Sequence, residues 1–173
     1  MKAEKIIVST AEIELEIEEV TLLSAEEYNA YKERIPPVHC WWWLRSPGRG
    51  TDLAANVRSE ETTDYRGDLV VHGTCAVRPV LKIRNPLAAN LEILDRFTLA
   101  KHTWTVISED LAICDDIVGK TCFRNDWKAA DANIYEVSDI KTWLAGWTQE
   151  NGISEQYYPD TVIYPLTERG KEL

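Results

Sequence analysis

Trp41-Trp42-Trp43-Leu44-Arg45-Ser46-Pro47-Gly48 is the part of this chain that says most about how it folds. Three of the seven tryptophans stand side by side, directly before an arginine and a Pro-Gly turn. Successive side chains of an extended segment point to opposite faces, so Trp41 and Trp43 would share one face while Trp42 takes the other. Each indole can bury roughly 200 Å². We therefore expect a strand that packs two layers at once and ends in the turn.

A second motif, Ala76-Val77-Arg78-Pro79-Val80-Leu81, brings another arginine. The guanidinium groups of Arg45 and Arg78 could stack on indole faces and donate to backbone carbonyls, which lysine could not copy. The competing hypothesis is an aromatic shelf for a sugar or peptide, with arginine at its rim. We favour a scaffold, because buried aromatic rings with a paired cation are commonly structural. The residues predicted to form it are Trp41, Trp42, Trp43, Arg45, Pro47, Gly48, Arg78, Pro79, Trp104 and Trp143.

Two helices are predicted from their capping residues. Ser24 and Glu27 have the spacing of a capping box, and the helix that they begin runs to about Arg34, ahead of a Pro-Pro pair. Ser138 is a natural N-cap for a second helix, and Gly146 stands where a C-cap glycine belongs.

Short strands are predicted from period-two alternation and from turn residues. Ala11–Ile17 alternates apolar residues with glutamates, and the change of phase after Glu18-Glu19 indicates a bulge. Pro79 predicts that its strand lies at the edge of a sheet or contains a bulge, because proline has no N–H to donate to a neighbouring strand. The other extended segments are Trp41–Arg45, Leu53–Val57, Leu69–His72, Cys75–Ile83, Phe97–Leu99, Thr103–Ile107, Leu111–Cys114 and Thr161–Tyr164. This pattern predicts one α+β domain over residues 1–173, with two main helices packed on an irregular antiparallel sheet.

The charge of the chain limits its partners. The formal net charge is −10, whereas direct binding to a phosphate backbone needs an excess of Lys and Arg, so we exclude nucleic acid. No window approaches the ~18 apolar residues of a membrane helix, and we expect no membrane contact and a cytoplasmic location in a bacterial host. The predicted acidic face of the first strand consists of Glu12, Glu14, Glu16, Glu18 and Glu19.

Catalytic and metal-binding signatures are weak. The sequence lacks GxSxG, HExxH, a P-loop and GxGxxG, and its four cysteines form no CxxC pair. His39-Cys40 and His72-Gly73-Thr74-Cys75 could converge on a zinc ion, but packing of reduced cysteines in the core is the simpler interpretation. Asp115-Asp116 could bind a cation, although adjacent carboxylates on an extended chain point apart. We expect no enzymatic activity, no cofactor and no metal.

Two sets of motifs carry a family resemblance. The first set is Val20–Tyr28, Trp42–Gly48 and Val77–Leu81. The second set is Phe97–Leu99, Thr103–Ile107, Asn125–Trp127 and Ser138–Gly146. The first resembles the C-terminal half of the DUF6273 family, a bacterial and phage domain of unknown function, and the second resembles its opening hairpin and helix. The resemblance implies a fold similar to that of C-type lectins.

The two sets stand in the reverse of the family order. The resemblance therefore implies a circular permutation, with halves at residues 1–84 and 97–150 and a connector at 85–96. Two partial domains in tandem are the alternative, which we disfavour because neither half alone has enough apolar residues for a core. The family glycine before Val-Arg-Pro is Ala76 here, and the asparagine of the family helix is Ala145. Both departures argue against carrying over a function.

The leading functional hypothesis is a non-enzymatic, lectin-like binding module encoded by a phage or prophage. It would present the polar stretch Arg49–Gly67 to a protein or glycan partner, since loops on a rigid scaffold often carry recognition. The candidate binding residues are Arg49, Thr51, Asp52, Asn56, Arg58, Asp64, Tyr65 and Arg66. Two alternatives stay open. One is an acidic inhibitor whose glutamates imitate phosphate charge against a host nucleic-acid-handling defence protein, with steep salt dependence. The other is a structural component of a virion.

Overall fold

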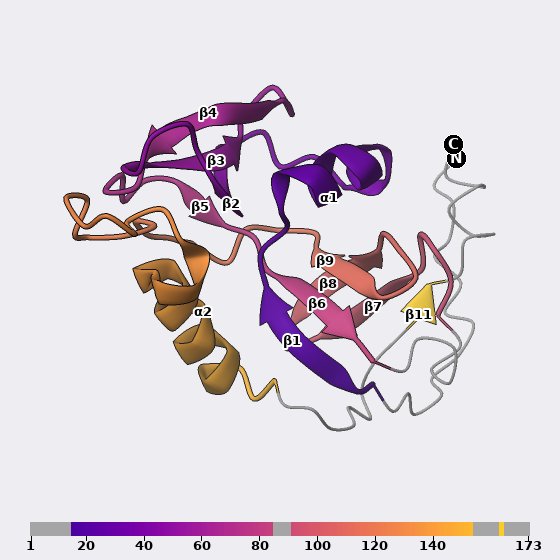
Figure 1. Ribbon diagram of the computed structural model, residues 1–173. Helices are drawn as coiled ribbons and strands as arrows, with labels where there is room; N and C mark the ends of the chain where they lie inside the picture. The colour runs from indigo at the N-terminus through magenta and orange to yellow at the C-terminus, as the bar shows by residue number, and fades with distance from the viewer. Residues whose placement is uncertain (1–14, 85–90, 154–162, 165–173) are drawn as a thin grey trace.

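Two β-sheets form the frame of the molecule (Figure 1). The computed structural model describes residues 15–84, 91–153 and 163–164. One sheet has six strands in the order β1-β6-β9-β8-β7-β11, and the other has five in the order β10-β5-β2-β3-β4. All neighbouring strands pair antiparallel except β2 and β5, which are parallel.

The element bounds agree with most of the predicted segments. The six-stranded sheet contains β1 (Ile17–Thr21), β6 (Val80–Ile83), β7 (Arg96–Leu99), β8 (His102–Val106), β9 (Leu111–Cys114) and β11 (Ile163–Tyr164). The five-stranded sheet contains β2 (Trp42–Pro47), β3 (Leu53–Val57), β4 (Thr63–Leu69), β5 (Ala76–Val77) and β10 (Gly119–Lys120). The helices are α1 (Ala25–Tyr31), α2 (Asp139–Glu150) and two 3₁₀ turns, η1 (Lys32–Arg34) and η2 (Tyr135–Val137).

The first strand begins later than predicted. Most of the predicted segment Ala11–Ile17 lies outside the described residues, and β1 instead runs onward from Ile17 to Thr21. Its register against β6 shifts between Ile17 and Glu19, which confirms the bulge that the change of phase predicted.

The capping box at the start of α1 is confirmed. Ser24 Oγ accepts a hydrogen bond from the N–H of Glu27 at 3.0 Å, and the Glu27 carboxylate accepts one from the N–H of Ser24 at 2.8 Å. These two bonds satisfy donors that a helix start otherwise leaves unpaired. The helix tightens into η1 and ends at Arg34, before the Pro-Pro pair, as predicted.

The tryptophan strand β2 separates two hydrophobic cores. Trp43 lies in the first core, with Trp104, Phe97 and α2 residues such as Leu144. Trp42 lies in the second core, where Tyr28 of α1 meets its ring edge-on at 5.6 Å. Trp42 and Trp43 are completely buried. The helices α2 and α1 therefore cover opposite faces of the same strand (Figure 1).

Trp41 departs from the predicted role in the core. It precedes β2, is 38% exposed and belongs to neither hydrophobic core, because the strand that would hold it begins one residue later. The guanidinium of Arg58 lies over the indole instead, 5.0 Å from its centroid.

The chain passes from one sheet to the other at Arg78-Pro79. The predicted strand Cys75–Ile83 is divided there: β5 belongs to the five-stranded sheet and β6 to the six-stranded sheet. Proline is suited to this break because it donates no ladder hydrogen bond. The predicted strand Leu69–His72 is wrong, since β4 ends at Leu69 and the N–H of His72 closes a turn onto the Leu69 carbonyl at 3.0 Å.

Helix α2 begins as predicted and ends later. Ser138 caps it by accepting from the N–H of Lys141 at 3.1 Å. The predicted C-cap at Gly146 is wrong, because the helix continues to Glu150 and Gly152 takes the left-handed conformation, with φ of 65°. Ile140, Leu144 and Trp147 stay in register with the first core across Gly146, and burying them outweighs the cost of about 1 kcal/mol of a glycine inside a helix.

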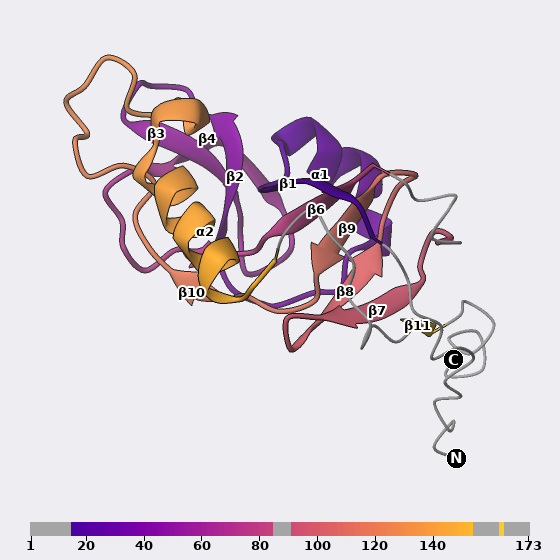
Figure 2. The same cartoon turned by 90° about the horizontal axis from the view of Figure 1, so that it is seen from below.

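Both sheets take strands from the beginning and from the end of the chain. Strand β9 pairs with β6 in one sheet, and β10 pairs with β5 in the other. The molecule is therefore one α+β domain, as predicted. The segment between β10 and α2 extends beyond the rest of the ribbon in two perpendicular views (Figures 1 and 2).

Candidate functional site

The predicted polar loop at residues 49–67 is a β-hairpin. Strands β3 and β4 occupy most of it, and β4 is the outer strand of the five-stranded sheet. The register of β4 slips against β3 between Ala54 and Asn56, so β4 bulges outward at this point. Gly67 takes φ of 92°, and a Cβ there would lie 2.6 Å from the Ala54 carbonyl oxygen, so only glycine fits.

Asn56 is removed from the binding surface by this geometry. Its side chain is completely buried on β3, between Trp43 of β2 and Asp64 of β4 in register. Neither its amide oxygen nor its amide nitrogen has a hydrogen-bond partner in the described part of the chain. The prediction that Asn56 lies on the binding surface is therefore corrected. Because side chains alternate along a strand, Asn56 lies on the same face of the sheet as Trp43, and this face is buried there.

Arg58 and Asp64 are engaged with one another. Their side chains form an ion pair at 3.0 Å, while Arg58 also lies over Trp41. The N–H of Gly67 donates to Asp64 Oδ1 at 3.2 Å, so the carboxylate fastens the bulge. Burial raises the pKa of Asp64, but the hydrogen bonds from Arg58 and Gly67 outweigh it and lower the pKa. Both side chains therefore stabilise the hairpin and are less available for contacts with a partner.

Four of the predicted binding residues remain on the surface. Arg49, Thr51, Tyr65 and Arg66 are exposed, Tyr65 by 59%. The N–H of Arg49 donates to the Arg66 carbonyl at 2.8 Å, which places the two arginines on neighbouring stretches of backbone. The turn that carries Arg49 and Thr51 is fixed to the rest of the domain.

Two hydrogen bonds hold that turn. The carbonyl of Gly50 accepts from Asn133 Nδ2 at 2.9 Å, and the carbonyl of the half-buried Asp52 accepts from the N–H of Val70 at 2.9 Å. The first contact joins the hairpin to the segment before α2. The exposed side chains of the turn are therefore presented by a fixed backbone.

Arg78 is completely buried at the crossing between the sheets. Its Nε donates to the Cys114 carbonyl at 2.8 Å, and its Nη2 donates to the carbonyls of Pro36 at 2.5 Å and Asp115 at 3.0 Å. The guanidinium also lies 5.2 Å from the centroid of a Trp42 ring. Burial lowers the pKa of Arg78, but an arginine stays protonated at any ordinary pH. One side chain thus joins three segments of chain.

Arg45 binds backbone and carboxylate. It donates to the Leu22 carbonyl at 2.6 Å and pairs with Glu27, the capping residue of α1. Ser46, which follows it, accepts from the N–H of Ala25 at 2.9 Å. The tryptophan motif therefore holds the start of α1 in place.

The remaining scaffold residues lie around the first core. Trp104 is buried and donates to the Leu99 carbonyl at 3.0 Å. Trp143 is half-buried and packs so closely on Gly119 that a Cβ there would lie 2.7 Å from the ring. Both indoles serve packing between α2 and the sheets.

The cysteines and histidines do not gather into a metal site. Among the residues that the structure describes, no group of three or more His, Cys, Asp or Glu side chains is placed to hold a metal ion. Cys75 belongs to the first core, whereas Cys40 packs against the second, across the sheet. The His72 side chain pairs with Asp68 at 2.8 Å and lies on the surface. Burial raises the pKa of both thiols, which keeps them protonated.

The paired carboxylates of the sequence have separate roles. Asp115 accepts from Thr105 Oγ1 at 2.5 Å and lies 3.3 Å from Arg96 Nε, whereas Asp116 is exposed. Sequence reasoning missed Glu61, which accepts hydrogen bonds from the N–H groups of Val38 (3.3 Å) and His39 (3.0 Å). Its positive φ of 62° could not be inferred from residue type.

The acidic face is only partly described. Glu12 and Glu14 lie outside the described residues. The bulge in β1 leaves Glu18 and Glu19 both exposed, and Glu18 lies 4.0 Å from Lys82, while Glu16 is half-buried. Consecutive exposure at the bulge replaces the strict alternation that the sequence predicted.

The comparison with protein families matches the part of the chain that contains the tryptophan motif. The model of DUF6273, a domain of unknown function, matches residues 8–85. This part of the chain belongs to the DUF6273 family. The matched DUF6273 region contains β1 to β6, including the β3–β4 hairpin and the buried Arg78.

The other comparisons add no relative. Searches of the curated proteins and of the solved structures found no match to the chain. In the described part of the chain, no helix has the length and apolar character needed to cross a membrane.

Proposed function

We propose that the protein is a non-enzymatic, lectin-like binding module of a phage or prophage, which recognises a protein or glycan through the outward surface of the β3–β4 hairpin. The observation that carries this proposal is the exposure of Tyr65 on the bulged outer strand, beside the exposed arginines Arg49 and Arg66. Exposed tyrosine and arginine side chains on one hairpin suit recognition, because they provide an aromatic face and planar hydrogen-bond donors.

The difference in exposure among the aromatic residues supports the same proposal. Trp42, Trp43 and Trp104 are buried and act in packing, and Trp41 is covered on one ring face by Arg58. Tyr65 by contrast has 59% of its surface open to solvent. A hairpin held by Gly67 and by the Gly50–Asn133 hydrogen bond presents these side chains with little conformational freedom left to lose on binding.

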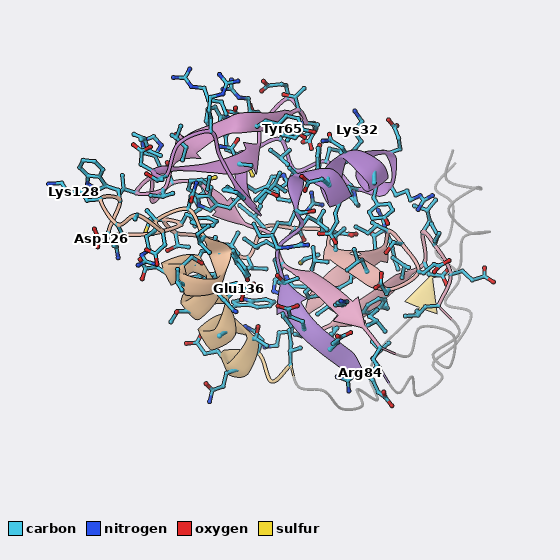
Figure 3. All side chains as sticks on the ribbon, in the orientation of Figure 1. Lys32, Tyr65, Arg84, Asp126, Lys128 and Glu136 are labelled. Carbon is cyan, nitrogen blue, oxygen red and sulfur yellow. The ribbon has the colours of Figure 1, made fainter. Side chains whose placement is uncertain are left out.

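The test uses the full chain with a charge reversal on the hairpin and a matched reversal elsewhere. Arg66→Glu changes the proposed surface, while Arg84→Glu makes the same change at an exposed arginine at the opposite end of the molecule from Tyr65 (Figure 3). Labelled protein is applied to a glycan array and to a panel of bacterial surface proteins. We expect a ligand whose binding is lost with Arg66→Glu and with Tyr65→Ala but kept with Arg84→Glu. Equal binding by all variants, or no ligand on either panel, contradicts the proposal.

A further inference from the structure

Exposed apolar side chains concentrate on one part of the surface. Of the seven large hydrophobic residues that are exposed among the described residues, five lie at the end of β4, on the turn after it and on the segment between β10 and α2. These five are Leu69, Val71, Trp127, Ile134 and Val137. The two segments lie side by side, because the carbonyl of Val70 accepts from the N–H groups of Phe123 (2.8 Å) and Arg124 (3.0 Å). We call this region the Trp127 surface.

The segment that carries Trp127 is held in a defined shape. Arg124 donates to the Val137 carbonyl and lies 3.6 Å from the Asp131 carboxylate, so it joins the two ends of the segment. The N–H of Asn125 donates to Asp139 of α2 at 2.6 Å, and Asn133 holds the Gly50 carbonyl. Successive turns are closed by backbone hydrogen bonds such as Ala129 N–H to the Asp126 carbonyl at 3.3 Å. A backbone fixed at both ends loses little freedom when it binds.

Trp127 itself has little to do in the fold. Its side chain is 48% exposed, and the ammonium of Lys128 lies 5.3 Å from the ring centroid. Asp126 and Lys128, which flank it, stand at the outer tip of the segment, away from both sheets and helices (Figure 3). A rigid loop that holds an indole in water resembles the anchor of a protein interface, where tryptophan contributes strongly once it is buried in a pocket.

The surrounding charges indicate which kind of pocket fits. Residues 124–139 carry four carboxylates against two cations, in a chain whose net charge is −10. Asp131 pairs with Arg124 and Glu136 pairs with Lys141 of α2, so the excess of negative charge in the segment rests on Asp126 and Asp139. Exposed aliphatic side chains on the same segment, such as Ile134 and Val137, offer nothing to sugar hydroxyls, which disfavours a glycan. An anionic lipid surface would be repelled, and a second copy of this chain would bring the same acidic rim.

We propose that the Trp127 surface docks a protein partner that receives Trp127 in an apolar pocket rimmed by lysine and arginine. This inference goes beyond the proposed function, because it concerns a surface centred on Trp127 and not on Tyr65. The other exposed apolar residues of the surface enlarge the apolar contact and exclude water from its edge. The acidic rim speeds encounter with a basic partner and sets its orientation.

A displayed peptide library tests the proposal and supplies the probe. Peptides are selected on the immobilised full chain, and the consensus peptide is titrated by fluorescence anisotropy. We expect the enriched sequences to combine aromatic or aliphatic residues with Lys and Arg, and the affinity to fall as salt is added. Trp127→Ala should weaken binding at least about 30-fold, equivalent to about 2 kcal/mol, and Asp126→Lys should weaken it about 5-fold.

The controls separate this surface from the hairpin. Tyr65→Ala and Arg66→Glu should leave the affinity for the consensus peptide within about 2-fold, so a failed hairpin proposal does not affect this result. Selection of acidic or purely polar peptides would overturn the inference, and so would unchanged binding by Trp127→Ala or enrichment of nothing. A concentration-dependent dimer that Trp127→Ala dissolves would assign the surface to a second copy instead and would also overturn it.

Discussion

Replacing Arg78 should destabilise the fold more than any other change to a single charged side chain in the described chain. Its guanidinium donates to the buried Cys114 carbonyl and to the partly buried carbonyls of Pro36 and Asp115, and it lies over Trp42. A hydrogen bond to a charged group contributes about 1.5–3 kcal/mol, and a cation–π contact about 0.5–2 kcal/mol. The contributions are not additive, because the segments relax together once the guanidinium is gone.

Arg78→Ala is expected to lower the free energy of unfolding by about 3–5 kcal/mol, since it removes the guanidinium that donates to three carbonyls and leaves a cavity beside Trp42. The free energy of unfolding of a small domain is about 5–15 kcal/mol in total, so the variant should be soluble but much less stable than the wild type. Arg78→Lys keeps the charge but offers a single nitrogen, which cannot reach the Pro36 carbonyl and the two carbonyls of Cys114-Asp115 at once. We expect a loss of about 2–3 kcal/mol for lysine.

Urea unfolding followed by far-UV circular dichroism measures both variants, with Arg84→Ala as the control. Arg84 is exposed, so its removal should change the free energy of unfolding by less than about 0.5 kcal/mol. An Arg78→Ala variant within about 1 kcal/mol of the wild type would refute the reasoning. A lysine variant as stable as the wild type would show that the charge alone matters and that the three-way geometry does not.

Three other substitutions or cuts probe separate parts of the fold. Burial raises the pKa of Glu27, but hydrogen bonds from Ser24 and the charge of Arg45 outweigh it and lower the pKa. The Glu27 carboxylate should therefore stabilise the fold at neutral pH, and this stabilisation should be lost as the pH falls through the lowered pKa. The urea midpoints of Glu27→Gln and of the wild type should accordingly converge towards about pH 3. Asn56→Leu should raise the melting temperature, because it removes two unpaired buried polar atoms at about 1–3 kcal/mol each, and a clear decrease would mean that Asn56 has an unseen partner. A protease site inserted within residues 85–90 should, after cleavage, leave two fragments that co-elute in gel filtration, whereas either fragment expressed alone should give the circular dichroism spectrum of an unfolded chain.

The helix caps could be predicted from the sequence, because each depends on residues only a few positions apart. The box between Ser24 and Glu27 and the cap at Ser138 depend only on spacing and residue type, and both are present. The hairpin turn after β8 is equally local, with Ser108 Oγ accepting from the N–H of Leu111 at 3.1 Å. Gly146 was misread because the register of three buried side chains on α2 outweighs the cost of one glycine.

The candidate site could be predicted only in part. Strand β4 was missed because its residues are mostly polar, although Tyr65 and Leu69 alternate with Asp64, Arg66 and Asp68 in the period of a strand. As an outer strand it has one edge in solvent, so it needs few apolar residues. The burial of Asn56 depends on its pairing with Trp43, a contact that sequence distance conceals.

The way in which the two halves share their sheets bears on the circular permutation that the family resemblance implies. Strand β6 of the first half is hydrogen-bonded to β9 of the second, and β5 of the first half pairs with β10 of the second. Ladder hydrogen bonds and buried apolar area depend on where strands lie and not on which segment is synthesised first. Covalent order enters mainly through the entropy of loop closure, which changes slowly with loop length. The circular permutation remains a proposal, and the shared sheets support it, because a chain opened at 85–96 and closed elsewhere would keep every one of these pairings.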